Sequence, residues 1–471
     1  MPEKQLAKRV AIVGAGLAGL SAAESLARQA KGKLEIMLFE GRRRPGGRAG
    51  SFTDPNSGET IDYCQHVLMG CCTNAIGLIE RCGLMNRLRR YDALTFVHPQ
   101  HPPSRFAASR LPAPLHLAGA IGALCYLTKQ QKHEIRRGLF RLMRCNKEEL
   151  ASQTAGDWLR ANGQSDETIG DFWDVILVSA LGEQSDLVAM GPARKVLMDG
   201  FAAAKGASDL LVPAVPLSEL FGQGVSQAVA QLGVNQRQAS IRRVAFDSEN
   251  AEAVIEAADG SRYQADHVII AVPWHSTAKM LSDLAWDGLR QCQSFRPSSI
   301  TGIHLWFDRP ITELPHAVMV GSAAQWLFRD PLGNSSSGPS DEYYYQVVIS
   351  ASGESGALSK EVLLEQVLGE IRAVFPQAAD ASLIRSRMVS DPQAVFSITP
   401  EVEALRPPAR TALPWLHLAG DWIATGWPAT MEGAVISGRM AASSLMEQEF
   451  GQRVTVDPGL PRGWLADRMI K

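Results

Sequence analysis

The sequence lacks the features that mark a disulfide-stapled, zinc-binding or membrane-spanning protein. Its seven cysteines are an odd number with no C-x-x-C pair, and its ten histidines show no metal-ligand spacing. These absences argue against a disulfide framework or a metal site, and favour reduced thiols in a cytoplasmic protein. The longest uncharged stretch, 111–128, contains two prolines and barely reaches the length of a spanning helix. The apolar run at 10–20 carries patterned glycines and alanines, unlike a signal peptide.

An excess of charge of either sign is also missing. The formal net charge is −2, with 45% hydrophobic and 20% charged residues, which is ordinary for a globular protein. Nothing in this balance indicates a nucleic-acid partner. The 471 residues are too many for one hydrophobic core, so we expect two or three structural units.

The first forty residues have the pattern of a β-α-β unit. A β-branched run at 9–13 predicts a buried strand, helical periodicity follows at 17–29, and 34–39 reads as a second strand. Such a unit implies a parallel sheet and an α/β fold.

A G-x-G-x-x-G motif joins the first strand to the first helix. Glycines at these positions permit a tight turn, close approach of a diphosphate and close packing of helix on strand. The free N–H groups of the helix N-terminus favour the negative charge. The cofactor-binding residues expected from this motif are Gly14, Gly16, Leu17, Ala18 and Gly19. Glu40 ends the second strand, where a carboxylate can bind the ribose hydroxyls.

Three further features favour FAD over NAD. An R-P-G-G-R stretch ends at Arg48, which suits a second contact with the diphosphate. An L-A-G-D stretch ends a buried strand at Asp421, which can hold a ribityl hydroxyl. An M-E-G-A-V stretch opens a helix at Met431, whose N–H groups would face the flavin edge that gains negative charge on reduction. The expected cofactor contacts from these segments are Gly47, Arg48, Gly420, Asp421 and Met431.

The pattern along the chain predicts an α/β fold, α+β overall, with a Rossmann-like FAD-binding domain and a discontinuous mixed substrate domain. The FAD-binding domain would comprise 1–92, 208–275 and 405–450, and the substrate-binding domain 93–207 and 276–404. Residues 451–471 would form a C-terminal tail. Within the second domain we expect strands at 300–307 and 343–350, a helix at 360–374 and a Gly/Ser/Pro-rich loop at 330–341.

These motifs resemble the amine oxidase and phytoene desaturase superfamily of FAD enzymes, over nearly the whole chain. The A-D-x-V-I-I-A-V-P stretch at 265–273 also fits this superfamily. The resemblance implies that the backbone of Ile241, at the start of a preceding strand, contacts the adenine. It also implies non-covalent FAD, because attachment sites in the superfamily lie near the C-terminal motif, where this chain has no cysteine.

A narrower resemblance is to the squalene-associated desaturase-like group, the hydroxysqualene dehydroxylases. It rests on I-D-Y-C-Q-H-V-L-M-G at 61–70, L-V-P-x-V-P-L-S at 211–218, and the segment 420–434. It implies reductive removal of the hydroxyl of hydroxysqualene to give squalene, in bacterial squalene and hopanoid synthesis. The implied partners are an isoprenoid lipid substrate and other enzymes of the squalene pathway.

Removing an allylic hydroxyl requires a proton for the oxygen and a hydride for the carbon. The candidate proton donors are Asp62, His66 and Glu183. Other interpretations remain open: Asp62 as a helix cap, and His66 as a buried histidine with its hydrogen bonds satisfied.

The stretch 111–128 is followed by a basic segment. Its basic residues are Lys129, Lys132, Arg136, Arg137, Arg141 and Arg144. One interpretation is peripheral contact with the anionic inner face of the cell membrane. The other is a core helix followed by a solvated basic helix.

Two other functions share the cofactor motifs. One is a carotenoid-type desaturase or amine oxidase, which runs the flavin in the opposite direction. The other is a prenyl-lipid carrier without catalysis, against which the intact glycines, Arg48 and Asp421 argue. The electron donor is open between NAD(P)H acting directly and a separate reductase, because no second complete G-x-G-x-x-G unit is evident.

Overall fold

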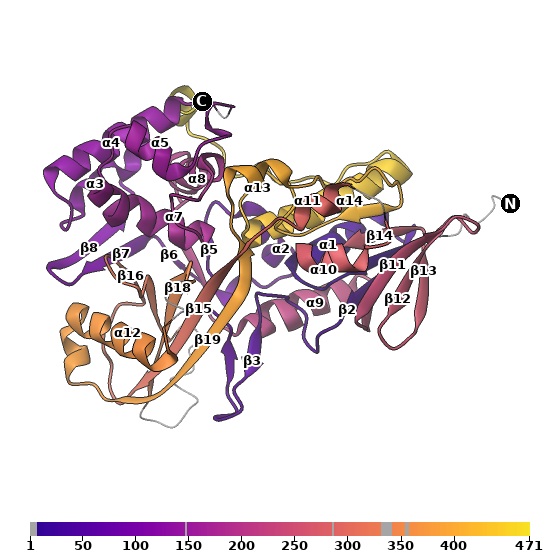
Figure 1. The fold of residues 1–471 in the computed structure, drawn as a ribbon, viewed down its shortest axis with the longest axis horizontal. Helices are drawn as coiled ribbons and strands as arrows, with labels where there is room; N and C mark the ends of the chain where they lie inside the picture. Colours follow the sequence, from indigo (N-terminus) through magenta and orange to yellow (C-terminus); the bar gives the residue numbers. More distant parts are fainter. Residues whose placement is uncertain (1–6, 147, 285–286, 331–341, 354–357) are drawn as a thin grey trace.

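The computed structural model describes residues 7–146, 148–284, 287–330, 342–353 and 358–471. In Figure 1 a parallel sheet and the helices that pack on it together occupy one side of the molecule. A larger mixed sheet and a group of helices lie on the other side. All of the predicted loop 330–341 except Asp330 lies outside the described residues.

The first sheet is parallel, with the strand order β10-β2-β1-β14-β20. Its strands are β1 (Lys8–Val13), β2 (Leu34–Glu40), β10 (Asn235–Gln238), β14 (His267–Ile270) and β20 (Leu416–Leu418). Both β14 and β20 are buried throughout, as expected of a parallel sheet covered on both faces. The predicted β-α-β unit is confirmed, with helix α1 spanning Leu17–Ala30.

Helices α1 and α14 (Met431–Phe450) pack closely against each other. The Ser21 hydroxyl of α1 donates a hydrogen bond to the Val435 carbonyl of α14, at 2.8 Å. At Gly438 a Cβ atom would lie only 2.1 Å from the Ala18 carbonyl oxygen. Only glycine therefore allows the two backbones to come this close.

The larger sheet has seven strands, in the order β19-β15-β18-β17-β16-β7-β8. Its strands are β7 (Ala93–His98), β8 (His101–Ala107), β15 (Pro297–Phe307), β16 (His316–Met319), β17 (Trp326–Arg329), β18 (Tyr343–Ser350) and β19 (Leu383–Phe396). Helix α12 (Lys360–Val374) packs Leu363, Val367 and Ile371 into the core with the sheet. The strands predicted at 300–307 and 343–350 and the helix at 360–374 are confirmed.

The chain between β8 and β9 forms a group of helices, which we call the helical group. Its members are η2 (Leu115–Leu117), α3 (Ala118–Ala123), α4 (Lys129–Arg144), η3 (Glu148–Leu150), α5 (Ala155–Ala161), α6 (Asp166–Thr168), η4 (Ile169–Trp173), α7 (Asp174–Leu181), α8 (Met190–Leu197) and η5 (Met198–Ala202). The indole N–H of Trp326 on β17 donates to the Ser179 hydroxyl on α7 at 3.0 Å, which ties this group to the larger sheet. Among the described residues, no helix is long and apolar enough to cross a membrane.

The remaining elements form three small sheets and the connections between the large ones. The strands are β3 (Ser51–Thr53), β4 (Thr60–Asp62), β5 (Leu68–Met69), β6 (Leu88–Tyr91), β9 (Leu210–Pro213), β11 (Ile241–Asp247), β12 (Glu252–Ala257) and β13 (Arg262–Ala265). The helices are α2 (Thr73–Arg81), η1 (Met85–Arg87), η6 (Ser218–Val225), α9 (Ser226–Gln231), α10 (Trp274–Met280), α11 (Asp287–Cys292), η9 (Pro376–Ala379), α13 (Pro400–Leu405) and α15 (Trp464–Met469).

The C-terminal residues pack against distant parts of the chain. The Asp457 N–H donates to the Asn74 side chain at 2.9 Å, and the Lys471 N–H donates to the Met143 carbonyl of α4 at 2.9 Å. The predicted tail 451–471 therefore joins the end of α14 to the helical group.

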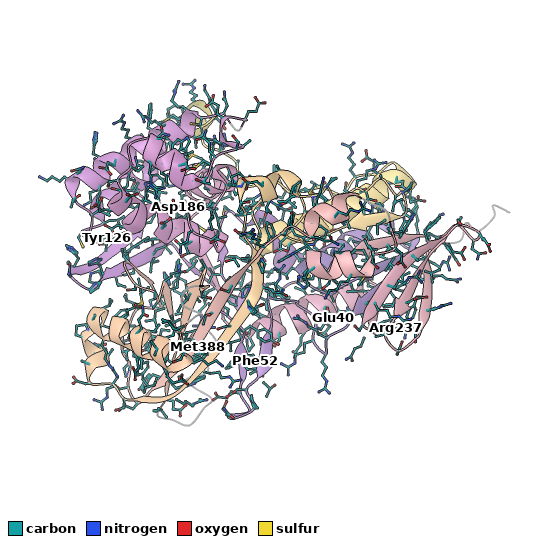
Figure 2. The ribbon with its side chains drawn as sticks, viewed as in Figure 1. Glu40, Phe52, Tyr126, Asp186, Arg237 and Met388 are labelled. Carbon is teal, nitrogen blue, oxygen red and sulfur yellow. The ribbon has the colours of Figure 1, made fainter. Side chains whose placement is uncertain are left out.

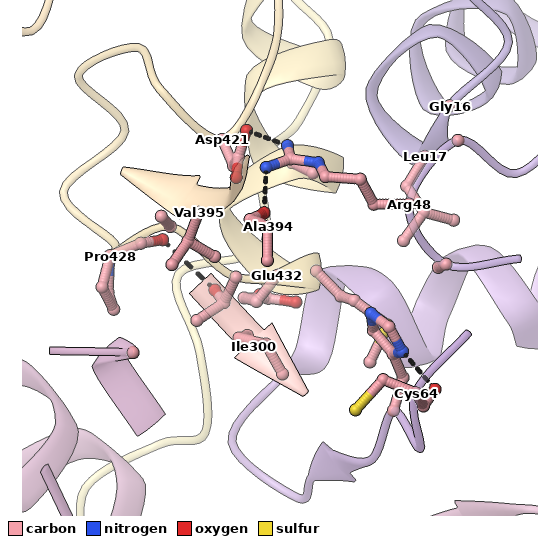
Figure 3. Close-up of a pocket in the computed structure, with 18 of the residues that line it drawn as sticks. Gly16, Leu17, Arg48, Cys64, Ile300, Ala394, Val395, Asp421, Pro428 and Glu432 are labelled. Carbon is pink, nitrogen blue, oxygen red and sulfur yellow. Dashed lines mark hydrogen bonds and ion pairs between the residues drawn. The ribbon is translucent and has the colours of Figure 1, made fainter. Parts of the chain in front are cut away.

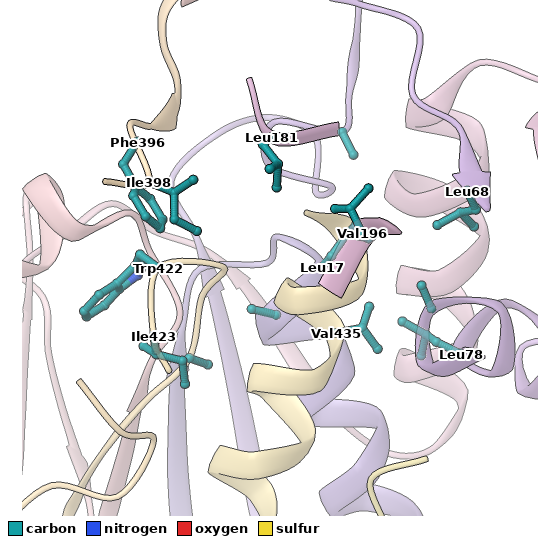
Figure 4. Close-up of a cluster of buried hydrophobic side chains, with 14 of the residues drawn as sticks. Leu17, Leu68, Leu78, Leu181, Val196, Phe396, Ile398, Trp422, Ile423 and Val435 are labelled. Carbon is teal, nitrogen blue, oxygen red and sulfur yellow. The ribbon is translucent and has the colours of Figure 1, made fainter. Parts of the chain in front are cut away.

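The main apolar core is continuous from the parallel sheet into the helical group. It contains Leu17 of α1, Val435 of α14, Leu78 of α2, Leu181 of α7 and Val196 of α8 (Figure 4). The two sides of the molecule therefore share a core, which fixes the position of the helical group over the parallel sheet.

Two glycine-to-alanine changes test the close contact between α1 and α14. We expect Gly438→Ala to destabilise the protein by about 3 kcal/mol or more, because the new methyl group overlaps a backbone carbonyl. The control is Gly369→Ala on α12, where no atom beyond the neighbouring residues and the backbone of the helix itself lies within 4 Å of the new Cβ. It is expected to stabilise by roughly 0.5–1 kcal/mol through helix propensity. Urea unfolding measures both, and equal midpoints for the two variants would contradict the packing argument.

Candidate functional site

A cavity of about 650 Å³ opens at the carboxyl edge of the parallel sheet. Val13, Phe39, Ala271 and Gly420, which end or follow the strands, line one side of it. The larger sheet and the helical group line the other side. Ligands of open α/β sheets bind at this edge, and the volume is in the usual range for ligand sites.

The first glycine turn leaves room for an anion against helix α1. Gly14 has a φ of +104°, and a Cβ there would lie 2.7 Å from the Ala271 carbonyl oxygen. No side chain caps the N-terminus of α1, and its first turn contains no acidic residue. Gly16, Leu17 and Ala18 line the cavity, so free backbone N–H groups and the positive end of the helix dipole lie at its wall. Gly19 packs on the turn, since a Cβ there would lie 1.9 Å from the Gly14 carbonyl oxygen.

The second glycine turn lies directly against the first. The Gly46 N–H donates to the Ala15 carbonyl at 2.8 Å, and a Cβ on Gly47 would lie 3.2 Å from the Gly16 Cα. Both glycines line the cavity. The two turns therefore form one wall without side chains, which fits a diphosphate approached from both sides.

Glu40 and Ile241 both line the cavity, and their segments are joined where the Ala239 N–H donates to the Glu40 carbonyl at 2.9 Å. The Glu40 carboxylate accepts from the backbone N–H groups of Ala15 and Arg42, each at 2.9 Å, which fixes its direction at the end of β2. Ile241 begins β11, as the sequence predicts. Figure 2 shows Glu40 on the same side of the molecule as Arg237 of β10, the strand that pairs with β2.

Arg48 and Asp421 form an ion pair inside the cavity. The Arg48 guanidinium donates to the Asp421 carboxylate at 2.6 Å and to the Ala394 carbonyl at 2.7 Å (Figure 3). Both residues line the cavity, so the ion pair joins the end of the R-P-G-G-R stretch to the end of the L-A-G-D stretch at the cavity wall. They fit a ligand that carries both a diphosphate and hydroxyl groups.

The start of α14 forms a further wall. Met431 lines the cavity, and the Thr430 hydroxyl caps the helix by accepting from the Gly433 N–H at 3.2 Å. Glu432 is buried and accepts from the N–H groups of Asn74 and Ala75, at 3.0 and 2.8 Å, so it caps α2. Burial raises the pKa of Glu432. The glutamate of the M-E-G-A-V stretch thus joins α14 to α2.

Apolar side chains dominate the rest of the cavity. They come from β7, α7, α8, η5, β15, β16, β17, β18 and β19, and include Leu94, Phe96, Val175, Ile176, Val196, Phe201, Ile300, Val318, Phe328, Val348, Val389 and Val395. The Ser179 hydroxyl, also in the lining, already donates to the Val175 carbonyl and accepts from Trp326. This half of the cavity fits a hydrophobic molecule.

Of the three candidate proton donors, only His66 lines the cavity. Its Nδ1 lies 2.9 Å from the Cys64 carbonyl oxygen, and because a carbonyl can only accept, Nδ1 carries a proton and Nε2 is left for a ligand. Burial lowers the pKa of His66.

Asp62 and Glu183, the other two candidates, do not line the cavity. The Asp62 carboxylate is buried and accepts from the Leu217 N–H at 2.9 Å, before η6, and from the Ser51 hydroxyl at 2.5 Å. It is a structural cap, and burial raises its pKa to about 7. Glu183 follows the end of α7 and accepts from the N–H of Gln184 at 3.0 Å.

Gln65 and His275 are polar residues of the cavity that were not among the predicted site residues. Gln65 is buried, and its Oε1 has no hydrogen-bond partner within the described residues. His275 lies just after β14, near Arg48 and Asp391, and burial lowers its pKa. Its place after a buried strand of the parallel sheet was the signal in the sequence.

Comparison with known proteins agrees with this geometry. The 15-cis-phytoene desaturase of Synechococcus elongatus is 26% identical over 466 residues, covering 94% of this chain and 96% of the relative. The hydroxysqualene dehydroxylase of Zymomonas mobilis is 27% identical over 460 residues, covering 92% and 97%. An oxidoreductase structure from Methanosarcina mazei shares the fold, with a TM-score of 0.68 and 15% identity, covering 91% and 98%.

The family of flavin containing amine oxidoreductases matches residues 17–446, from the first residue of α1 into α14. The mixed α/β fold agrees with this match. The chain therefore belongs to the flavin containing amine oxidoreductase family and is an FAD-dependent oxidoreductase.

Proposed function

We propose that this enzyme removes the hydroxyl group of hydroxysqualene to give squalene, in bacterial squalene and hopanoid synthesis. The observation that carries the proposal is the composition of the cavity. A long wall of apolar side chains continues directly from the FAD cradle, by which we mean the two glycine turns, Glu40, Arg48, Asp421 and the start of α14. The Ser179 hydroxyl in this wall already has hydrogen-bond partners in Val175 and Trp326. A linear isoprenoid fits such a wall better than a polar amine does. NAD(P)H, directly or through a reductase, is the proposed electron source.

FAD would be held by the two glycine turns, Glu40, Arg48, Asp421 and the start of α14, and when bound and reduced it supplies a hydride. The apolar wall excludes water, which protects an allylic centre as its C–O bond breaks. The departing hydroxyl takes up one proton and leaves as water. His66 is the proposed donor: its imidazolium form would give up the Nε2 proton and keep the Nδ1 proton, which the Cys64 carbonyl accepts.

A second candidate is a carotenoid-type desaturase. It is favoured by the similar identity to 15-cis-phytoene desaturase and by the same apolar wall, which suits a polyene precursor equally well. It differs in direction, because it oxidises its substrate and needs no proton for a leaving oxygen. A carrier without catalysis is set aside by membership of the oxidoreductase family.

One assay separates the two reactions. The purified enzyme is reduced under anaerobic conditions, incubated with hydroxysqualene, and the lipid extract is analysed by mass spectrometry. Squalene is the expected product. Unchanged hydroxysqualene, together with dehydrogenation of phytoene by the oxidised enzyme, would reverse the assignment.

The first glycine turn gives a prediction for cofactor binding. In Gly16→Ala the new Cβ would meet only the Gly47 Cα, at 3.8 Å, so the protein should fold while the methyl group occupies the diphosphate position. We expect FAD binding to weaken by about tenfold or more. Flavin absorbance and calorimetric titration measure it, with Gly369→Ala as the control. Unchanged affinity in Gly16→Ala would show that the diphosphate binds elsewhere.

The role of His66 predicts a pH dependence. Because its pKa lies below the ordinary value, the protonated donor is lost as pH rises through that lowered pKa, and kcat should fall in the same range. His66→Gln should lower kcat by roughly 10²–10⁴ and remove this limb of the pH profile. His275→Gln is the matched control, since it changes another cavity histidine with a lowered pKa. An unchanged profile in His66→Gln would exclude His66 as the donor.

A further inference from the structure

An apolar surface lies exposed at the end of the molecule that carries the helical group. Leu111 and Leu115 are 51% and 42% exposed, and four small residues of α3 are exposed beside them. Those residues are Ala118, Gly119, Gly122 and Ala123. Tyr126, which follows α3, lies at the far end of the molecule from Glu40 (Figure 2). The surface is therefore remote from the ribose end of the FAD cradle.

Basic side chains flank this apolar surface on two sides. On one side the Lys132 ammonium donates to the Gly122 carbonyl at 2.9 Å, and a Cβ on Gly122 would lie 3.8 Å from the Arg136 guanidinium. On the other side the exposed Lys205 donates to the Arg110 carbonyl at 2.8 Å, next to Leu111. Lys205 comes from a distant part of the sequence, so the structure completes a patch that the basic helix alone did not define.

The face of α4 that carries Lys132 and Arg136 continues with Phe140, because residues four apart share a helix face. Phe140 is 52% exposed. We call the set Leu111, Leu115, Lys132, Arg136, Phe140 and Lys205 the docking face.

Two other arginines of α4, Arg137 and Arg141, point elsewhere. Arg141 donates to the Asn162 side chain at 3.1 Å, and the Arg137 guanidinium would lie 3.8 Å from a Cβ on Gly163, at the end of α5. The acidic Glu134 is turned the same way and accepts from Ser165 and Thr168. The docking face thus combines apolar and cationic groups, while Glu134 of the same helix is hydrogen-bonded to Ser165 and Thr168.

The docking face is one layer away from the cavity. Helix η2, which carries Leu115, contacts η5, and the buried ring of His116 lies close to the backbone of Phe201 and Ala204. Phe201 lines the apolar half of the cavity. Helices η2 and η5 therefore lie between the docking face and the apolar half of the cavity.

We propose that the docking face binds the surface of an anionic lipid bilayer, and that the substrate passes from the bilayer into the cavity beside η2 and η5. A bilayer is the occupant that matches this face, since leucines and a phenylalanine can insert at the headgroup boundary while the basic side chains pair with anionic headgroups. The passage of substrate rests on the proposed function, whereas the binding of lipid does not.

Sedimentation with vesicles tests the binding. The flavoprotein is mixed with phosphatidylcholine vesicles, with and without phosphatidylglycerol, at low and high salt. We expect it to sediment with the anionic vesicles at low salt, and Lys132→Glu/Arg136→Glu to weaken partitioning by about 20-fold or more. Leu111→Ser/Leu115→Ser should weaken binding at both salt concentrations.

The matched control is Lys360→Glu/Arg372→Glu on α12, which makes the same change of charge at exposed residues of another helix. It should bind like the unchanged enzyme, and the melting temperature and flavin content of each variant verify folding. Failure of the unchanged enzyme to sediment with anionic vesicles at low salt would overturn the proposal. So would equal loss of binding in the docking-face and control variants. Neither result bears on the dehydroxylation assay, which needs no vesicles.

Discussion

The close contact of α1 with α14 is the constraint on which the site depends. Gly438 allows the backbones to touch at Ala18, and the Ser21 hydroxyl bonds across to Val435. Both helices begin at the cavity, so their packing places two helix N-termini at a fixed separation along one ligand. The buried Glu24 carboxylate of α1 accepts from Arg28 on the same helix and from Arg81 of α2, so it ties α1 to α2.

The second organising feature is the division of the cavity into a polar and an apolar half. Where the cradle ends, Arg48 and Asp421 neutralise each other, and beyond them the lining is formed largely by side chains of the larger sheet and the helical group. Charge is therefore concentrated where a diphosphate and ribityl chain would lie. This distribution suits a reaction between a charged, hydrophilic cofactor bound in the polar half and an apolar substrate bound in the other half.

Local patterns in the sequence were sufficient for the elements of the cradle. The β-branched run of β1, the glycine turn and the periodicity of α1 are each determined by neighbouring residues, so their prediction held to within a residue or two. Side chains whose roles depend on distant segments were not predictable in this way. The direction of Asp62 is set by Leu217, and the neighbourhood of Lys205 is set by Arg110. Only the folded chain brings such pairs together.

The hydrogen bonds from Asn74 and Ala75 to Glu432 have a consequence for the evolution of this site. The Glu432 carboxylate, in the first turn of α14, caps the N-terminus of α2. The loop at 427–431 and the start of α2 are therefore held by the same carboxylate. Substitutions at position 74 would therefore be transmitted to the loop at 427–431, although 357 residues separate Ala75 from Glu432 along the chain. Divergence in these two segments is expected to occur jointly, with each constraining the changes that the other can accept.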